Sequence, residues 1–184
     1  MNIKYPYFNE DHEGIREMAK DFAEKTLAPI AGEIDKTEAF PMDVVKTMAD
    51  MGFLGLKIPE EDGGLGLDMR SYICVMEEIA KKCATATIFI SSANSLSTAP
   101  IVISGTPEQK EKYLPGVAAG ENFIAFGLTE PNAGSDAASM TTRAVEDGDS
   151  YILNGRKCFI TNGGIASFLS LIHISEPTRR VVIS

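Results

Sequence analysis

The chain has 184 residues, 44% of them hydrophobic, and carries a formal net charge of -9. This length suits one domain, or one and a fraction, at roughly 100–200 residues per domain. The acidic balance opposes contact with phosphate backbones, so we expect no nucleic-acid partner.

Cysteine and histidine are sparse. Cys74 and Cys83 are nine positions apart, which places them on opposite faces of a helix, and Cys158 is far from both. Because there is no CxxC motif, we expect small buried thiols in a reducing compartment rather than disulfides. His12 and His173 are too far apart in sequence to predict a metal site.

The N-terminal residues 1–10 lack the apolar core of a signal peptide. This predicts a cytoplasmic protein, although an organellar matrix protein that has lost its transit peptide would look the same. Residues 83–107 contain no charge, but Ser, Thr, Asn and two Pro interrupt them. They therefore predict a buried helix rather than a membrane span.

The first 57 residues predict two helices. Residues 9–35 repeat apolar side chains at helical spacing, with Asn9 as the expected cap and Pro29 as a kink or break. Pro41 suits a first helical position, and Gly52 is expected to end the second helix.

A glycine-rich loop over residues 58–68 contains no phosphate-binding motif. Asp68 is the expected cap of a helix that runs to Cys83, and residues 84–104 continue as helix with small side chains. Thr106 is expected to cap a shorter, charged helix.

After Gly120 the pattern changes from helix to strand. The pair Asn154-Gly155 is a strong short-range hairpin signal, and residues 146–149 predict a further turn. Without a β-α-β alternation, a Rossmann fold is disfavoured. The expected strands are 123–128, 140–145, 150–153 and 156–161.

Several sequence blocks occur together in one order. They include MGFLGLKIPEEDGGLGLD at 51–68, EQKEKYLP at 108–115, GLTEPNAGSD at 127–136 and NGRKCFITNGG at 154–164. With these blocks in place, the chain resembles the acyl-CoA dehydrogenase family from about residue 10 to about residue 168.

The resemblance implies an α+β multidomain fold. An N-terminal α-helical bundle would occupy residues 1–120, followed by an incomplete antiparallel β-barrel domain at 121–167. The family's C-terminal helical domain would be missing. Residues 168–184 do not follow the family pattern, and we expect them to be a foreign or frameshifted reading frame.

The resemblance also implies the chemistry. Members remove the α-proton of an acyl-CoA thioester and transfer the β-hydrogen, as hydride, to N5 of FAD, which gives the trans-2-enoyl-CoA. The flavin carries the difficult step, and the protein binds and orients. The implied partners are the acyl-CoA substrate, with short or medium chains favoured, an electron-transfer flavoprotein, and further copies of the chain in a dimer or tetramer.

The site residues are carried over motif by motif. Thr129 would bond to the pyrimidine side of the flavin ring, and Ser135 would reach the pyrophosphate and border the acyl-CoA. Thr161 would lie beside N5, and Phe159 would pack against the ring. The full cofactor-binding set is Phe126, Gly127, Leu128, Thr129, Gly134, Ser135, Phe159, Ile160 and Thr161.

The catalytic base is a Glu expected beyond residue 184, so we expect this chain alone to be inactive. Simpler interpretations remain open: Thr129 and Ser135 as ordinary turn and cap residues, and Glu130 as a locally bonded side chain. The small-residue run at 86–99 would suit either an acyl pocket or a close helix pair. Alternative functions are an acyl-CoA oxidase, a decarboxylating flavoenzyme of the same fold, or a non-catalytic helical binding fragment.

Overall fold

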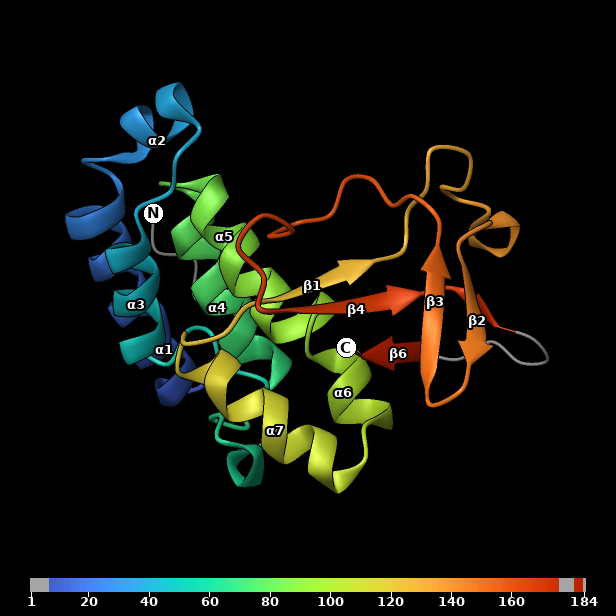
Figure 1. Ribbon diagram of the computed structural model, residues 1–184. Coiled ribbons are helices and arrows are strands. Elements are labelled where there is room, and N and C mark those ends of the chain that lie inside the picture. The colour runs from blue at the N-terminus through green and yellow to red at the C-terminus, as the bar shows by residue number, and fades with distance from the viewer. Residues whose placement is uncertain (1–6, 176–180, 184) are drawn as a thin grey trace. The chain divides into compact units, whose positions relative to one another are not determined.

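The computed structural model describes residues 7–175 and 181–183, which divide between two compact units, Met1–Glu121 and Asn122–Ser184 (Figure 1). The first unit is helical and the second is built mainly from strands. The expected order, a helical domain followed by a partial β domain, is confirmed.

The first unit contains seven α-helices among the described residues, together with short π and 3-10 turns. The α-helices are α1 (Glu10–Phe22), α2 (Ala31–Thr37), α3 (Met42–Asp50), α4 (Met69–Ala80), α5 (Ala84–Ser91), α6 (Ala99–Ser104) and α7 (Pro107–Ala118). The π turns are Ala23–Leu27 and Ser92–Leu96, and a 3-10 turn covers Glu60–Asp62.

Helix α1 begins where the sequence predicts. The Asn9 side chain accepts a hydrogen bond from the His12 amide at 3.0 Å, and His12 Nδ1 accepts one from the Asn9 amide at 3.1 Å. This reciprocal capping satisfies two amides that the helix itself leaves free. The helix ends in a π turn before Pro29, which divides it from α2 as expected.

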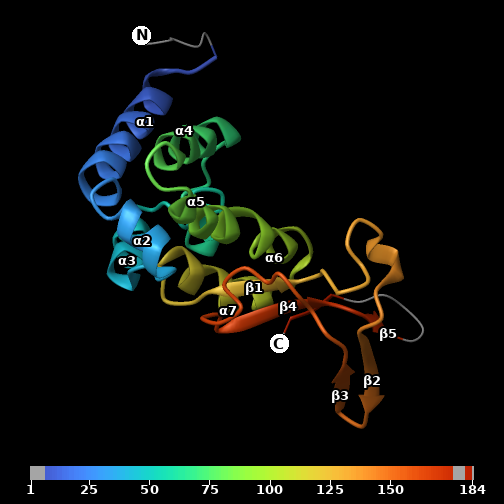
Figure 2. The ribbon, with the colours of Figure 1, turned by 90° about the horizontal axis from the view of Figure 1, so that it is seen from above.

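Helices α1 and α4 pack side by side in the first unit (Figure 2). Arg16 of α1 bonds Glu77 at 2.6 Å and Glu78 at 3.1 Å, both on α4. Phe22 at the end of α1 meets Phe53 edge-on, with ring centroids 5.7 Å apart. Ion pairs thus hold α1 against α4, and an aromatic contact packs the end of α1 against Phe53.

The segment between α3 and α4 folds back on itself, and hydrogen bonds with the Asn94 side chain hold it in place. Gly64 allows its close approach, because a Cβ there would overlap the Ile58 carbonyl oxygen. Asn94 is 2% exposed and bonds three backbone groups: the Lys57 amide at 2.9 Å and the carbonyls of Phe53 and Ile90 at 2.7 and 2.9 Å. One amide side chain thus joins the loop to α5.

One helical run, Ala84–Ser104, is long and apolar enough to cross a membrane by length and composition alone. Half of its most apolar window is buried inside the structure. Core helices of soluble proteins meet the same test, so the run carries little weight as a membrane signal.

The second unit holds two small sheets. One has the order β1-β4-β6 and the other β3-β2-β5. Their strands are β1 (Ile124–Gly127), β2 (Arg143–Asp147), β3 (Ser150–Asn154), β4 (Phe168–Ile172), β5 (Ile174–Ser175) and β6 (Val181–Ile183). The expected antiparallel pairing holds for β2 with β3, but β1–β4 and β2–β5 are parallel. Long connections make these parallel pairs possible.

The predicted hairpin at Asn154-Gly155 is wrong. The hairpin lies one strand earlier, at the further turn predicted for residues 146–149, where Asp147 pairs with Ser150 around a two-residue loop and Gly148 takes a φ of 62°. Gly155 instead follows β3, and a Cβ there would overlap the Thr142 side chain. This glycine is required by a close approach rather than by a turn between strands.

Residues 168–172 are part of the second unit rather than separate from it. They form β4, which pairs along β1 from Ile124 with Phe168 to Gly127 with Leu171. The start of the segment is fastened too, because the amides of Ser167 and Phe168 both donate to the Phe123 carbonyl, at 2.8 and 3.2 Å. The foreign origin of 168–184 stays a prediction, and residues 176–180 and 184 lie outside the described residues.

Replacing Asn94 with Ala should lower the free energy of unfolding by about 2–4 kcal/mol, because three buried backbone groups lose their partner. Thr47→Ala is the control: its exposed hydroxyl bonds only the Asp43 carbonyl of its own helix, at 2.9 Å. We expect it to change stability by less than about 0.5 kcal/mol. Urea unfolding followed by the helical circular dichroism signal measures both, and equal effects would contradict the assignment.

Candidate functional site

The first predicted segment begins at the end of β1. Gly127 is buried, and a Cβ there would come within 3.2 Å of Leu171 Cδ1 and 3.3 Å of Leu169 Cδ1. Only glycine fits this spacing without a shift of the neighbouring side chains. Phe126, Leu128 and Thr129 are half-buried around it.

A tight turn follows. Glu130 and Ala133 exchange backbone hydrogen bonds of 3.0 and 3.2 Å across Pro131 and Asn132. Beyond the turn, Gly134 and Ser135 are exposed, and a Cβ at Gly134 would meet no atom within 4 Å. The backbone here lies open to a ligand.

The structure brings the second predicted segment against the first. The Cys158 amide donates to the Thr129 carbonyl at 2.9 Å. Lys157 Nζ donates to the Leu128 carbonyl at 2.8 Å and to Glu130 Oε1 at 2.9 Å. Two motifs that are almost thirty positions apart in sequence are therefore joined directly, as the resemblance requires of two halves of one site.

Glu130 is the most fully bonded carboxylate in the second unit. The residue is 4% exposed. Its Oε2 accepts hydrogen bonds from the Thr141 amide and hydroxyl at 2.7 and 2.8 Å. Its Oε1 accepts hydrogen bonds from the Thr142 amide and from Lys157 Nζ, both at 2.9 Å. Burial alone would raise the pKa of Glu130, but the bonds from Thr142, Lys157 and Thr141 outweigh it and hold the pKa well below its usual range.

The residue after Cys158 has an unusual backbone. Phe159 takes a φ of 57°, and its side chain is 92% exposed. An aromatic residue seldom occupies this left-handed region, which costs on the order of 1–2 kcal/mol. Strain of this kind is found disproportionately at ligand-binding positions. Asn162 follows with a φ of 62°, so the turn that carries Thr161 is also left-handed at its end.

Three hydroxyls near the joined segments make no hydrogen bond to any other described residue: Thr129, Ser135 and Thr161. Ser135 and Thr161 are exposed and Thr129 is half-buried. Free hydroxyls, open backbone at Gly134 and an exposed aromatic ring suit a large planar ligand with a phosphate-bearing tail. The predicted residues therefore fit a flavin nucleotide.

The described residues contain no group of three His, Cys, Asp or Glu side chains that could hold a metal ion. The acidic stretch Glu60–Asp62 is a largely exposed 3-10 turn, as expected of a solvated loop. Burial raises the pKa of the Cys74 thiol, which keeps it protonated and unreactive.

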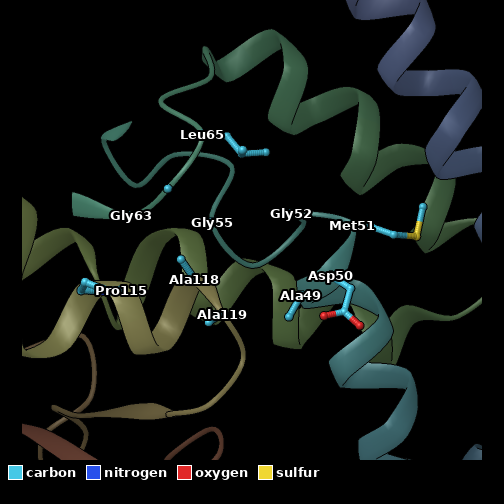
Figure 3. A pocket seen from close by; sticks show the side chains of 11 residues that line it. Ala49, Asp50, Met51, Gly52, Gly55, Gly63, Leu65, Pro115, Ala118 and Ala119 are labelled. Carbon is cyan, nitrogen blue, oxygen red and sulfur yellow. The ribbon is translucent and has the colours of Figure 1, made fainter. Parts of the chain in front are cut away.

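The first unit contains a cavity of about 360 Å³ between the α3–α4 loop and α7 (Figure 3). Small residues line it, with Gly52, Gly55 and Gly63 on the loop and Pro115 and Ala118 on the helix. None of the predicted site residues lies there. The run at 86–99 does not line this cavity either.

The small side chains of that run are mostly buried. Ala86 is 0% exposed, Ser92 4% and Ser97 1%, and the two serine hydroxyls bond each other at 2.8 Å. Such burial is typical of close helix packing, which was one of the two expectations. The acyl-pocket role stays a prediction.

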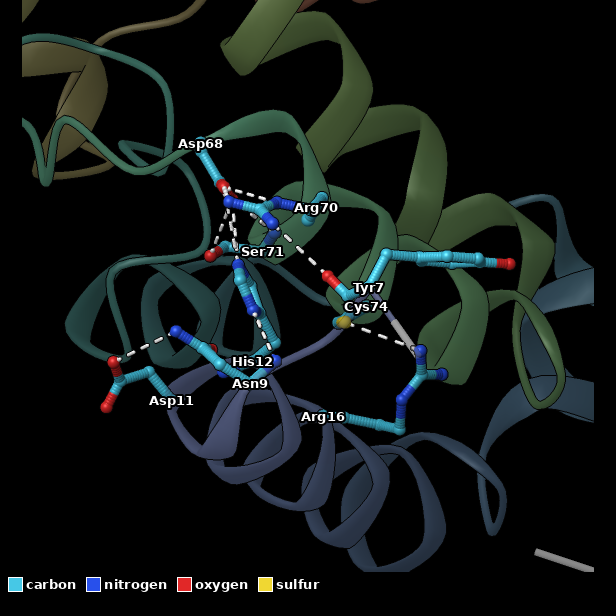
Figure 4. A network of polar contacts seen from close by, with 9 residues as sticks. All are labelled: Tyr7, Asn9, Asp11, His12, Arg16, Asp68, Arg70, Ser71 and Cys74. Carbon is cyan, nitrogen blue, oxygen red and sulfur yellow. Dashed lines mark hydrogen bonds and ion pairs between the residues drawn. The ribbon is translucent and has the colours of Figure 1, made fainter. Parts of the chain in front are cut away.

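A polar network joins the beginnings of α1 and α4 (Figure 4). Asp68 caps α4 by accepting a hydrogen bond from the Ser71 amide at 2.9 Å. Its carboxylate also bonds His12 Nε2 at 3.2 Å and accepts a hydrogen bond from Arg70 Nε at 2.7 Å. The Ser71 amide above all, with Arg70 and His12, holds the pKa of Asp68 well below its usual range. This network organises helices and contains none of the predicted site residues.

The comparisons with known proteins agree with the motifs. The model of the acyl-CoA dehydrogenase N-terminal domain matches residues 9–121, and that of the middle domain matches residues 125–183. The chain belongs to the acyl-CoA dehydrogenase family. The second match extends across the segment from residue 168 that sequence analysis set apart.

Among curated relatives, the 3-(aryl)acrylate reductase of Clostridium sporogenes is 54% identical over 160 residues, which is 87% of this chain and 42% of that protein. The short-chain specific acyl-CoA dehydrogenase of Clostridium acetobutylicum is 46% identical and covers 92% of this chain and 45% of its own length. A caffeyl-CoA reductase–Etf complex subunit of Acetobacterium woodii is 49% identical over 84% of this chain and 41% of its own. The chain thus spans less than half the length of these relatives.

Two solved structures share the fold. Butyryl-CoA dehydrogenase from Megasphaera elsdenii superposes with a TM-score of 0.85 at 38% identity, over 95% of this chain and 46% of that one. A glutaryl-CoA dehydrogenase from Mycobacterium smegmatis in complex with FADH2 gives a TM-score of 0.91 at 32% identity, over 96% of this chain and 46% of that one.

Two residues at this site were underrated by sequence analysis. Glu130 was expected at most to bond locally, and Lys157 was not singled out. The available signal was their position: each is a charged residue inside a block of small or apolar residues, where burial requires a partner.

Acid should reduce the stability that Glu130 contributes. Because its pKa is lowered in the folded state, this contribution is fully present above the ordinary glutamate value of about 4.3 and is lost progressively as the pH falls from there toward the lower folded-state pKa. Protection of the Thr141 and Thr142 amides from hydrogen exchange, corrected for intrinsic rate, should fall from pH 6 to pH 3. In Glu130→Gln the protection of these amides should already be lower at pH 6 and change little down to pH 3. Glu146→Gln, which alters an exposed side chain, should behave as wild type.

Replacing Phe159 with Asn should stabilise the chain by on the order of 0.5–1 kcal/mol, because Asn tolerates a positive φ and the exposed ring loses no burial. Phe159→Leu, which keeps the strain, should show no gain. Urea midpoints at equal protein concentration measure both. A loss of stability in Phe159→Asn would show that the ring is packed rather than exposed.

Proposed function

We propose that this chain is the N-terminal part of an FAD-dependent acyl-CoA dehydrogenase, which oxidises an acyl-CoA thioester to the trans-2-enoyl-CoA. The observation that carries the proposal is the direct joining of residues 128–130 to 157–158, which connects the two segments that carry the free hydroxyls and the exposed aromatic ring. The FADH2 complex of a 32% identical relative and the name of a 46% identical short-chain enzyme support it.

Each residue then has a binding task. Thr129 and Thr161 would donate hydrogen bonds to polar atoms of the ring, and Ser135 would bond the pyrophosphate. Phe159 would cover a ring face. When bound, FAD would supply the two-electron chemistry that side chains lack.

Glu130 is not suited to be the catalytic base. Glu130 is the buried carboxylate of the site, but all its acceptor positions are engaged by Thr141, Thr142 and Lys157 and its pKa is depressed. A general base must be free to take a proton and needs a pKa near the working pH. Glu130 meets neither requirement, so the Glu expected beyond residue 184 stays the proposed base.

A second candidate is the same chemistry run toward reduction. Two relatives, at 54% and 49% identity, are named as reductases of 3-(aryl)acrylates and of caffeyl-CoA. An enzyme that binds acyl-CoA and enoyl-CoA on one flavin can work in either direction, depending on its electron partner. An electron-transfer flavoprotein would be that partner, as the name of the 49% identical complex subunit suggests.

The full-length protein that contains this chain should bind FAD with a stoichiometry of one per subunit and bleach at 450 nm when butyryl-CoA is added. The binding of FAD separates a flavoenzyme from a helical binding protein. Rapid reoxidation of the reduced form by air would instead indicate an acyl-CoA oxidase. A protein that takes up no FAD from a micromolar titration would overturn the proposal.

The direction of the reaction, oxidation or reduction, is tested by comparing two substrate and electron-partner pairs. If the enzyme is a dehydrogenase, butyryl-CoA with an artificial one-electron acceptor should turn over faster than caffeyl-CoA with dithionite-reduced flavoprotein. The reverse order would assign the reductive function. Size-exclusion chromatography of the same sample tests the expected dimer or tetramer.

A further inference from the structure

The Glu130–Lys157 pair is a buried ion pair. The side chains are 3% and 9% exposed, and Lys157 Nζ lies 2.9 Å from Glu130 Oε1. Removing two charges from water is costly, and apolar residues of similar volume often stabilise a fold as well or better. Stability alone therefore does not account for this pair.

The pair fixes the place of the first flavin segment. Besides Glu130, Lys157 Nζ bonds the Leu128 carbonyl at 2.8 Å, which immediately precedes Thr129. The Cys158 amide then bonds the Thr129 carbonyl itself. The backbone on both sides of the Thr129 hydroxyl is thus held by residues 157 and 158.

The same bonds fix the place of the second segment. Lys157 and Cys158 lead directly into Phe159, whose left-handed backbone must be maintained by its surroundings. Glu130 is in turn anchored to the Thr141 and Thr142 amides at 2.7 and 2.9 Å. The ion pair therefore connects three stretches of chain, and two of them carry predicted flavin contacts.

We propose that Lys157 and Glu130 are positioning residues for the flavin: they set the separation between Thr129 on one segment and Phe159 to Thr161 on the other. Neither side chain touches the ligand in this scheme. The inference rests on the proposed flavin site and names the interaction that keeps it in shape.

The absorption spectrum of the bound flavin distinguishes this positioning role from plain stabilisation of the fold. A bridge that only stabilised the unit would affect folding, and once the protein was folded and saturated with FAD the ring would sit as before. A bridge that sets the spacing of the ring's partners changes the surroundings of the ring itself. The visible absorption spectrum of bound flavin reports that change.

The experiment compares Lys157→Met with wild type in the full-length protein. Met keeps the length of the side chain but donates to neither Leu128 nor Glu130. We expect the FAD dissociation constant to rise about tenfold or more, the scale seen when residues that orient direct ligands are lost. At saturating FAD we also expect a shifted flavin absorption band, and Lys157→Arg should recover most of both.

Two further variants keep the test decisive. Glu130→Gln preserves shape and removes only the charge, so it serves if Lys157→Met fails to fold. Lys25→Met removes a matched Lys–Asp contact to Asp21, 2.7 Å long but exposed, in the helical unit, and should leave flavin binding unchanged.

A folded Lys157→Met protein with the wild-type dissociation constant overturns the inference. So does weaker binding with an unchanged spectrum at saturation, which would mark the pair as merely structural. If wild type itself binds no FAD, the proposed function fails first, so the two failures are distinguishable.

Discussion

The buried contact between Glu130 and Lys157 joins the segments of the second unit that carry the predicted flavin contacts. A lysine ammonium and a glutamate carboxylate enter a largely water-free interior only when nearly every polar atom finds a partner. Here the amides of Thr141 and Thr142, just before β2, and the carbonyl of Leu128, just after β1, provide those partners. An unpaired buried charge would be costly. The two charged side chains and their backbone partners must therefore come together in the same folded arrangement.

The helical unit uses the same device on a smaller scale. Asp68 gathers the Ser71 amide, the Arg70 side chain and His12, much as Glu130 gathers Thr141, Thr142 and Lys157. His12 Nδ1 accepts from a backbone amide, so its hydrogen must be on Nε2, where it donates to Asp68. In both units a carboxylate with a lowered pKa connects the beginnings or ends of chain segments that are distant in sequence.

Local signals predicted local structure well. Caps at Asn9, Asp68 and Thr106 and the break at Pro29 act within one turn of helix, so the sequence contains all that is needed to place them. The hairpin was misplaced because two glycine-containing turns compete over a short stretch. The strand that β3 pairs with is β2, which places Thr142 opposite Gly155, and this pairing is not encoded by the turn residues alone.

The site divides in the same way. That Thr129, Ser135 and Thr161 belong to one site is an expectation from motif resemblance. The structure shows that the segments around residues 128–130 and 157–158 are hydrogen-bonded to each other. Lys157 was not singled out and Glu130 was expected only to bond locally, because a buried ion pair is recognised only when both partners are seen. The left-handed Phe159 was equally invisible, since nothing in the residue type favours a positive φ.

Strand β4 shows what a conflict between local pattern and tertiary position looks like. Ser170 and His173 are fully buried, and Ser170 Oγ and His173 Nε2 have no hydrogen-bond partner among the described residues, while Leu169 is 37% exposed. Ser170 thus occupies an inward position of β4 that an apolar residue would usually fill, and His173 lies just after the strand. The site-bearing stretch is tied through Thr129, Glu130 and Cys158, and its bonds involve no side chain after residue 167. The bonds between the two predicted flavin segments thus lie within residues 128–158. The first segment also depends on β4, which pairs with β1 from Ile124 to Gly127 and packs over Gly127.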